Sequence, residues 1–200
     1  MDEKTKSELL GLFRSKLNRA MTYYLETCTR CGVCVDACHV YASTGELNHI
    51  SVYRHELVRR LYRKYFKARG KIWPSVGDAK TLTDMTVAEL YDAAYSCTGC
   101  RRCMVFCPFG IDTQMIMSIA KLLLIGASAE PEILSLLADT SVEKGKSLEF
   151  FKEGFLTGIK NLEKKVVERW QVEAGETPIP VDVEGADLLY VALAGAHSII

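Results

Sequence analysis

The sequence predicts an all-α protein organised around two cysteine loops. Apolar residues recur at helical spacing over most of the 200 residues, and the eight cysteines form two groups of identical spacing. Each group reads C-x2-C-x2-C-x3-C, and no cysteine lies outside the two groups. Helices that carry two thiol-rich loops are the simplest fold consistent with both observations.

Helices are predicted on both sides of the first cysteine group. Thr5 and Glu8 form a candidate capping box, and apolar residues repeat at helical spacing from residue 9 to residue 24. Beyond the group, apolar residues of the stretch 52–66 share one stripe, which predicts a second helix. The stretch 70–83 contains Trp-Pro and Gly-Asp pairs and is predicted to be a loop.

The second cysteine group repeats this scheme of a helix followed by a loop. Thr86 and Glu89 form another candidate capping box, which opens a short helix running up to Cys97. Behind the group, Asp112 is a candidate cap for an apolar helix over 113–125, which the next residue, a glycine, is expected to end. Pro108 suits a first helical turn.

The C-terminal part changes character along its length. Helices are expected near 131–138 and, as a long amphipathic helix, near 148–171. Two prolines in the stretch 177–180 then break the helical pattern. The compact apolar run 187–194 is either one short strand, which needs a pairing partner, or an apolar tail.

The cysteine spacing is typical of iron-sulfur proteins. A thiolate at every third residue lets one loop wrap three corners of an iron-sulfur cube, while the fourth cysteine points towards a neighbouring cluster. The pattern therefore predicts two [4Fe-4S] clusters and a role in electron transfer. One cluster is assigned to Cys28, Cys31, Cys34 and Cys107, and the other to Cys97, Cys100, Cys103 and Cys38. Because each set takes a ligand from the opposite half, metal binding should hold the fold together.

Zinc and disulfide bonds are the alternatives for these cysteines. CxxC pairs are common zinc ligands, but structural zinc sites usually take two ligands from each of two short knuckles rather than three from one loop. Disulfide frameworks belong to short secreted chains, whereas this chain begins MDEKTKSELL, without an apolar signal segment. A reducing, cytoplasmic location is expected.

Charge and hydropathy point to a soluble or peripheral protein. The formal net charge is zero, and the longest apolar stretches are interrupted and shorter than the roughly 20 residues of a membrane span. The stretch 53–71 nevertheless carries eight Lys or Arg and only one acid. This asymmetry is either a docking face for an acidic partner or lipid surface, or an ordinary solvated helix face. No nucleic-acid-binding motif accompanies it.

Three charged or titratable residues near the cysteines are candidates for tuning the clusters. His39 follows Cys38 where the second group has proline, so it either directs an N–H at a cluster sulfur or packs as an ordinary histidine. Arg101 and Arg102 lie inside the second group, where positive charge would favour the reduced cluster unless solvent screens it.

The strings CTRCGVCVDACHVYASTGE (28–46) and CTGCRRCMVFCPFGID (97–112), separated by the helical insert, resemble the iron-sulfur subunits of heterodisulfide-reductase-like complexes. The resemblance covers roughly residues 20–190 and matches all eight cysteines. It implies an α-helical ferredoxin-like domain with two [4Fe-4S] clusters. It also implies that the chain passes electrons between partner subunits at the cytoplasmic side of the membrane.

The resemblance extends to the lead-in of a further domain. The strings IPVD (179–182) and GADLLY (185–190) are similar to the linker and first strand before the cysteine-rich catalytic domain of larger members. The paired-cysteine motifs of that domain have no counterpart after Cys107. We therefore expect no substrate-converting site in this chain, which is either a small subunit or a shortened form of a longer protein.

Three regions and a set of partners follow from this interpretation. Residues 1–125 are expected to form the two-cluster domain, 126–176 a helical extension, and 177–200 a linker and tail. The implied partners are a cysteine-rich or flavin-containing catalytic subunit and a quinone-reactive membrane subunit. The alternative function is a zinc-stabilised interaction module that docks through its basic helix.

Overall fold

The computed structural model describes residues 1–73, 78–144 and 152–171, together with 179, 181, 183–185, 187 and 188. These residues form helices and connecting loops, and no strand occurs among them. The predicted all-α class is therefore confirmed for the described part of the chain. By compactness the chain divides into a first unit, Met1–Glu130, and a second unit, Pro131–Ile200.

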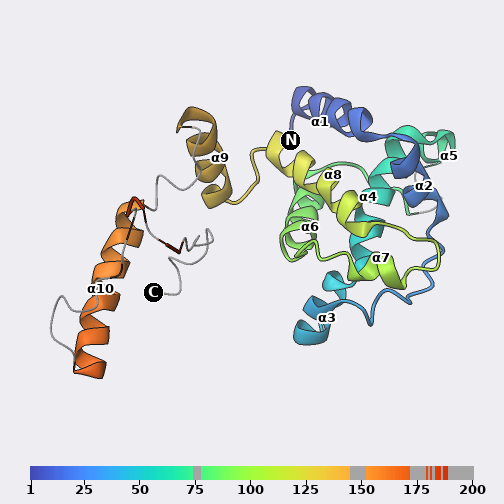
Figure 1. The fold of residues 1–200 in the computed structure, drawn as a ribbon. Helices are drawn as coiled ribbons and strands as arrows, with labels where there is room; N and C mark the ends of the chain where they lie inside the picture. The colour runs from blue at the N-terminus through green and yellow to red at the C-terminus, as the bar shows by residue number, and fades with distance from the viewer. Residues whose placement is uncertain are drawn as a thin grey trace. The chain divides into compact units, whose positions relative to one another are not determined.

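Two central helices organise the first unit (Figure 1). Its elements in chain order are α1 (Glu3–Lys16), α2 (Arg19–Thr27), α3 (His39–Thr44), the short 3-10 helix η1 (Leu47–His49), α4 (Ser51–Phe66), α5 (Ala68–Ile72), α6 (Asp84–Tyr95), α7 (Arg102–Phe106) and α8 (Thr113–Gly126). Helix α8 packs against α1, α4 and α6, and α4 packs in addition against α5 and α6. The predicted helix over 52–66 is thus present as α4 and lies inside the unit.

The N-terminal segment forms two helices rather than the single one predicted. Asp2 caps α1 by accepting a hydrogen bond from the Thr5 backbone N–H at 2.9 Å, so the predicted Thr5–Glu8 capping box is wrong. The helix ends at Lys16, and Asn18 caps α2 by accepting from the Met21 backbone at 2.8 Å. Asp and Asn are among the strongest N-cap residues, which explains both starts.

The predicted cap of α6 is wrong, and the predicted cap of α8 is confirmed. Helix α6 begins with a capping box between Thr83 and Thr86, one turn before the predicted Thr86–Glu89 pair. Asp112 caps α8 as predicted, accepting from the Met115 backbone at 3.2 Å.

The predicted role of Pro108 is wrong, whereas Gly126 ends α8 as predicted. Pro108 lies in a turn between α7 and α8 and not in a helix. Gly126 is the last residue of α8, and a Cβ there would lie 2.7 Å from a methyl carbon of Leu9, so close packing of α1 on α8 accounts for the glycine. The first three residues of the predicted loop 70–83 belong to the short helix α5 (Ala68–Ile72).

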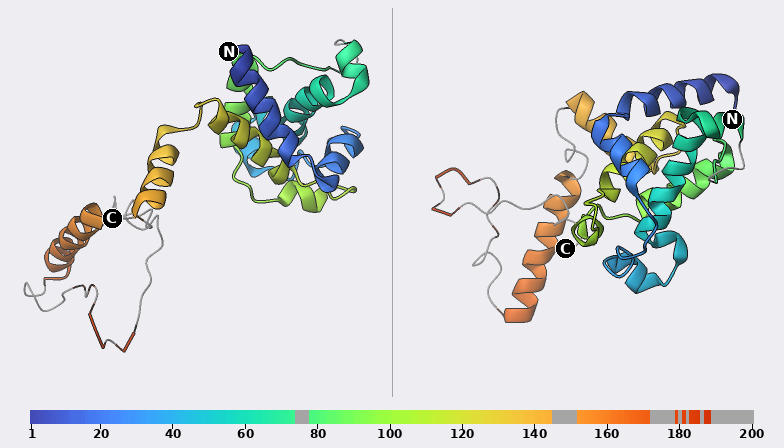
Figure 2. Two further views of the ribbon diagram at one scale, coloured as in Figure 1. Left: turned by 90° about the horizontal axis from the view of Figure 1, so that it is seen from above. Right: turned by 90° about the vertical axis from the view of Figure 1, so that its right-hand side faces the viewer.

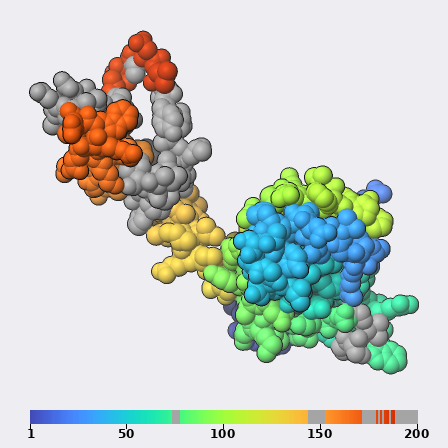
Figure 3. All heavy atoms as spheres, turned by 90° about the horizontal axis from the view of Figure 1, so that it is seen from below, coloured from blue at the N-terminus to red at the C-terminus, as the bar shows by residue number. Residues whose placement is uncertain are grey.

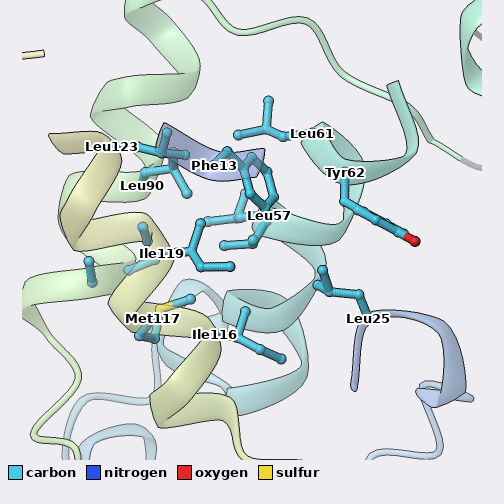
Figure 4. Packing of buried hydrophobic residues seen from close by; sticks show 14 of the residues in the cluster. Phe13, Leu25, Leu57, Leu61, Tyr62, Leu90, Ile116, Met117, Ile119 and Leu123 are labelled. Atoms are coloured by element: carbon cyan, nitrogen blue, oxygen red, sulfur yellow. The ribbon is translucent and has the colours of Figure 1, made fainter. Parts of the chain in front are cut away.

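The hydrophobic core forms where α1, α4, α6 and α8 meet (Figure 4). Phe13 of α1 is fully buried and its ring meets that of Phe66 edge to face, with centroids 5.1 Å apart. Leu57, Leu90 and Ile119 come from the other three helices and are also buried. Each such side chain contributes about 1.5–3 kcal/mol through burial, so this cluster is the main support for the loops that the helices carry.

The two cysteine loops lie at the end of the first unit opposite α1 (Figures 1 and 2). The first loop joins α2 to α3, and the second runs from the end of α6 through α7 to Cys107. In the space-filling view the segments around the two loops are neighbours on one face (Figure 3). The helical core thus brings together cysteines that are far apart in the sequence.

The second unit contains the two predicted C-terminal helices, α9 (Glu132–Lys144) and α10 (Lys152–Trp170). The predicted strand over 187–194 and most of the predicted tail 177–200 lie outside the described residues. No helix of the described part combines the length and apolar character needed to cross a membrane.

Replacing Phe13 by alanine tests the role of this core. The change removes a fully buried ring and leaves a cavity, so we expect the free energy of unfolding to fall by about 3–5 kcal/mol. Urea unfolding followed by far-ultraviolet circular dichroism measures it. The control is Leu12→Ala on the same helix, where the side chain is 37% exposed and the loss should be much smaller. Equal losses would show that the core is not centred on Phe13.

Candidate metal centre

Both cysteine loops have a left-handed backbone conformation at the same two positions. Arginine and glycine occupy these positions in opposite order in the two loops. The second and fourth positions after the first cysteine have positive φ angles in each loop. They are Arg30 (60°) and Gly32 (82°) in the first loop, and Gly99 (69°) and Arg101 (61°) in the second. Glycine adopts this left-handed conformation freely, whereas a residue with a side chain is strained there by roughly 1–2 kcal/mol. Each loop therefore carries one strained arginine, which must be held by other contacts.

Carboxylates on or next to the central helices hold these arginines. Arg30 donates from Nε and Nη2 to the two carboxylate oxygens of Glu56 on α4, at 3.0 and 2.6 Å, and also contacts Asp78 at 3.3 Å. Arg101 lies 3.1 Å from Asp112, the cap of α8, and donates to Gln114 at 3.1 Å. Arginine-carboxylate pairs are strong, and bidentate ones are also directional, so they offset the strain and fix each loop to a core helix.

The cysteines surround two hollows, each lined from both loops. The first hollow, of about 420 Å³, is lined by Cys28, Cys31 and Cys34 of the first loop and by Cys103 and Cys107 of the second. The second hollow, of about 370 Å³, is lined by Cys97, Cys100 and Cys103 of the second loop and by Cys38 of the first. The eight predicted ligands are thus brought together, and the fourth cysteine of each loop lies at the hollow formed mainly by the other loop.

The chemistry of the first hollow fits a group that binds several thiolates. Burial raises the pKa of the Cys34 thiol to about 11, and the nearby Cys103, Cys107 and Cys28 contribute to this rise because their thiolates repel a further negative charge. The thiols of both loops therefore approach one another closely enough to interact. Iron would relieve this repulsion because its positive charge compensates the thiolates that bind it. The sets of thiols at the two hollows fit [4Fe-4S] cubes, in which each thiolate binds a different iron.

A single metal ion has no comparable site in the described residues. No group of three or more His, Cys, Asp or Glu side chains within them is arranged around one ion. The four thiolates of a cube do not need to meet at one point, because each binds its own iron.

Cys38 has a different environment from Cys34. It is buried, and the buried Arg54 of α4 donates from Nη1 to its Sγ at 3.4 Å. Burial alone would raise the pKa of this thiol, but hydrogen bonds from the Tyr41 backbone and from Arg54 lower it below its ordinary value. The Cys38 thiolate is therefore stabilised by a positive charge and by donors at the start of α3.

Two of the eight basic residues in the stretch 53–71 are buried and do not lie on an exposed face. Arg54 is 2% and Arg59 8% exposed, and Arg59 donates to the Cys28 carbonyl at 2.7 Å. The only acid of the stretch, Glu56, is buried between Arg30, Arg59 and Arg63. The predictions of a docking face and of a solvated face are both wrong for these central residues, because their side chains fasten α4 to the first cysteine loop.

His39 lies at the rim of the second hollow rather than in the core. Its exposed ring places Nδ1 3.8 Å from Cys100 Sγ and Nε2 3.3 Å from Thr98 Oγ1. The packing alternative does not describe this position, and tuning by His39 stays a prediction. Arg102, the other charged candidate of the second loop, is exposed.

The buried charges of α4 were not predicted from the sequence. Arg54 lies at helical spacing from Leu57 and Leu61, so it falls on the apolar stripe of the helix. An arginine on the apolar stripe of a helix indicates a buried charge that has a specific partner.

Comparison with known proteins agrees with this geometry. Residues 24–111 match the 4Fe-4S dicluster domain family. The "Hdr-like menaquinol oxidoreductase iron-sulfur subunit 2" of Archaeoglobus fulgidus is 33% identical over 175 residues, which are 88% of this chain and 31% of that protein. The "Hdr-like menaquinol oxidoreductase iron-sulfur subunit" of Archaeoglobus profundus is 31% identical over 194 residues, 96% of this chain and 34% of that protein.

A shorter match involves a heterodisulfide reductase. One subunit of the dihydromethanophenazine:CoB--CoM heterodisulfide reductase of Methanosarcina acetivorans is 29% identical over 89 residues, 44% of this chain and 21% of that protein. The chain spans about a third of the length of its two Archaeoglobus relatives. No solved structure matches it significantly. The predicted resemblance and the predicted [4Fe-4S] cofactors are confirmed by these relatives and by the dicluster match.

Neutralising Glu56 tests whether this buried carboxylate holds the first cysteine loop. Glu56→Gln leaves the neighbouring arginine charges without their buried partner, so we expect a loss of about 3–5 kcal/mol of stability. Iron should also leave the protein faster in the presence of a chelator. Anaerobic unfolding and chelator-release kinetics measure the two effects. Asp78→Asn is the matched control because Asp78 contacts the same Arg30 from an exposed position. If both variants behaved alike, the burial of Glu56 would be irrelevant to the loop.

Proposed function

We propose that this chain is an electron-transfer subunit of an Hdr-like oxidoreductase complex. The proposal is supported by the match of residues 24–111 to the 4Fe-4S dicluster domain family and by the similarity to Hdr-like iron-sulfur subunits. In this role it relays single electrons through two [4Fe-4S] clusters. The observation that supports the proposal most directly is the pair of cysteine-lined hollows, each built from both loops.

We further propose the crossed ligand sets. The first cluster would be held by Cys28, Cys31, Cys34 and Cys107, and the second by Cys97, Cys100, Cys103 and Cys38. The position of Cys107 at the first hollow and of Cys38 at the second supports this assignment. Cys103 lines both hollows and is assigned to the second by its place in the spacing motif.

The residues of the chain would provide the surroundings that electron transfer needs. A bound [4Fe-4S] cluster accepts or releases one electron with its thiolate ligands unchanged. The buried residues Ile111 and Thr113 line the first hollow beside the thiols and limit the access of water. Arg30 and Arg101 fix the loops, so the ligands keep their positions when the charge changes.

The proposed partners of the chain follow from its similarity to known proteins. The Archaeoglobus relatives are named as menaquinol oxidoreductase subunits and are about three times as long as the matched region. From the similarity to these relatives we propose that a cysteine-rich or flavin-containing partner performs the substrate chemistry and that a quinone-reactive membrane subunit exchanges electrons with the complex.

Paired cysteine substitutions test the crossed sets. Cys28→Ala combined with Cys107→Ala removes two ligands from one proposed cluster, so about four irons per chain should remain after anaerobic purification. Cys28→Ala combined with Cys38→Ala removes one ligand from each proposed cluster, so both should be impaired and less iron should remain. Iron and sulfide analysis measures both. The opposite order of iron contents would mean that each loop supplies all four ligands of its own cluster.

Electron relay is tested in the complex purified through a tag on this chain. We expect the unmodified complex to contain about eight irons in this chain and to pass electrons from a quinol analogue to the partner. The variant with Cys28→Ala and Cys107→Ala should still assemble but lose this electron transfer, because the path is interrupted. Rapid-mixing spectroscopy follows the rate. Unchanged transfer in an assembled complex that lacks one cluster would refute the relay.

A further inference from the structure

Arg54 is the most unusual charged residue of the first unit. The residue is 2% exposed, and its guanidinium donates from Nη1 to Cys38 Sγ at 3.4 Å and from Nη2 to Ser96 Oγ at 2.9 Å. The remaining nitrogen, Nε, is buried without a hydrogen-bond partner. The partners found for this cation among the described residues are thus a hydroxyl and a thiol, and neither is a carboxylate.

The arginine that lines the first hollow is compensated differently. Arg30 contacts the buried carboxylate of Glu56 at 2.6 Å. His55, which also lines the first hollow, has its Nε2 3.0 Å from the Tyr24 carbonyl oxygen. At the second hollow, Arg101 is compensated by Asp112 at 3.1 Å, whereas Arg54 faces the hollow without a carboxylate partner among its described contacts.

This difference matters because an isolated buried charge is expensive. Removing a cation from water costs several kcal/mol unless an opposite charge or a full set of hydrogen bonds replaces the solvent. The thiolates around the second hollow, together with the negative charge that their cluster carries, are the nearest compensation for Arg54. The interaction strengthens when an electron is added, since the attraction grows with the negative charge and is weakly screened in a buried site.

We infer that Arg54 raises the reduction potential of the cluster at the second hollow and thereby makes it the first of the two to accept an electron. The inference rests on the proposed function, because it requires a cluster bound by Cys38. The inference assigns an order of reduction to two clusters whose cysteine spacings are the same. Electrons entering the chain would collect at the second hollow, and the cluster at the first hollow would be the stronger reductant.

Charge substitutions at Arg54 test the inference in the full-length protein with both clusters bound. Arg54→Gln removes the charge and keeps a donor, and Arg54→Lys keeps the charge. Each protein is titrated anaerobically with dithionite, which supplies the electron, while electron paramagnetic resonance follows the two clusters. We expect Arg54→Gln to make reduction of one cluster at least tenfold less favourable, a fall of about 59 mV for one electron, and Arg54→Lys to change it much less.

The matched control is Arg102→Gln. Arg102 lies in the second cysteine loop itself, but its side chain is exposed, so solvent should screen the loss of its charge. A shift from Arg102→Gln as large as that from Arg54→Gln would overturn the inference, because net charge rather than the buried contact would then set the potential. An Arg54→Gln protein with both potentials unchanged would overturn it as well.

A second variant covers the case in which Arg54→Gln does not retain its cluster. Ser96→Asp leaves Arg54 in place and puts a carboxylate beside its Nη2, which donates to the Ser96 hydroxyl in the unmodified protein. This neutralisation should lower the same potential, and an unchanged potential would again contradict the inference. These outcomes are distinguishable from failure of the proposed function. A protein purified without iron-sulfur clusters would contradict the proposed function before any titration begins.

Discussion

The meeting of thiols from two distant loops is the constraint on which the rest of the structure depends. Cys107 lines the first hollow and Cys38 lines the second, so each hollow takes part of its lining from the other half of the first unit. Helices α4 and α8 satisfy this constraint by packing against each other and against the helices that precede the loops. A cluster that takes thiolates from both loops would hold these segments together, so metal binding would be coupled to folding.

Helix α4 joins the hydrophobic core to the metal centre. One stripe of it buries Leu57 and Leu61 among the core residues. The neighbouring positions place Arg54 against Cys38 and Glu56 against Arg30. A displacement of this helix would therefore disturb the packing and both cysteine loops together. Such coupling gives ligand positions that change little with cluster charge, which is what fast electron transfer requires of its protein surroundings.

The cysteine spacing and the helical periodicity were sufficient to predict the all-α class, α4, the Asp112 cap and the set of cysteines that gather. They were insufficient for features that depend on choices among neighbouring residues. Asp2 caps α1 in place of the predicted Thr5, because several residues near a helix start can accept the same N–H groups. Asn18 starts a second helix that was not predicted. The basic stretch was misinterpreted because composition does not reveal which arginine faces the core. Arg54 and Arg59 became interpretable only when their partners in other segments were known.

A repeated motif produces unequal sites here because its surroundings are not repeated. Each loop has one arginine and one glycine at the same two left-handed positions, in opposite order, so these positions have the same backbone conformation in both loops. The first loop is fastened to the middle of α4 through Glu56, and the second to the start of α8 through Asp112. Since the thiolate ligands are chemically alike, any difference in their electron affinity must come from these contacts and from buried charge. The buried Arg54 beside Cys38 is one such difference, so two loops of the same spacing can differ through residues outside the cysteine motif.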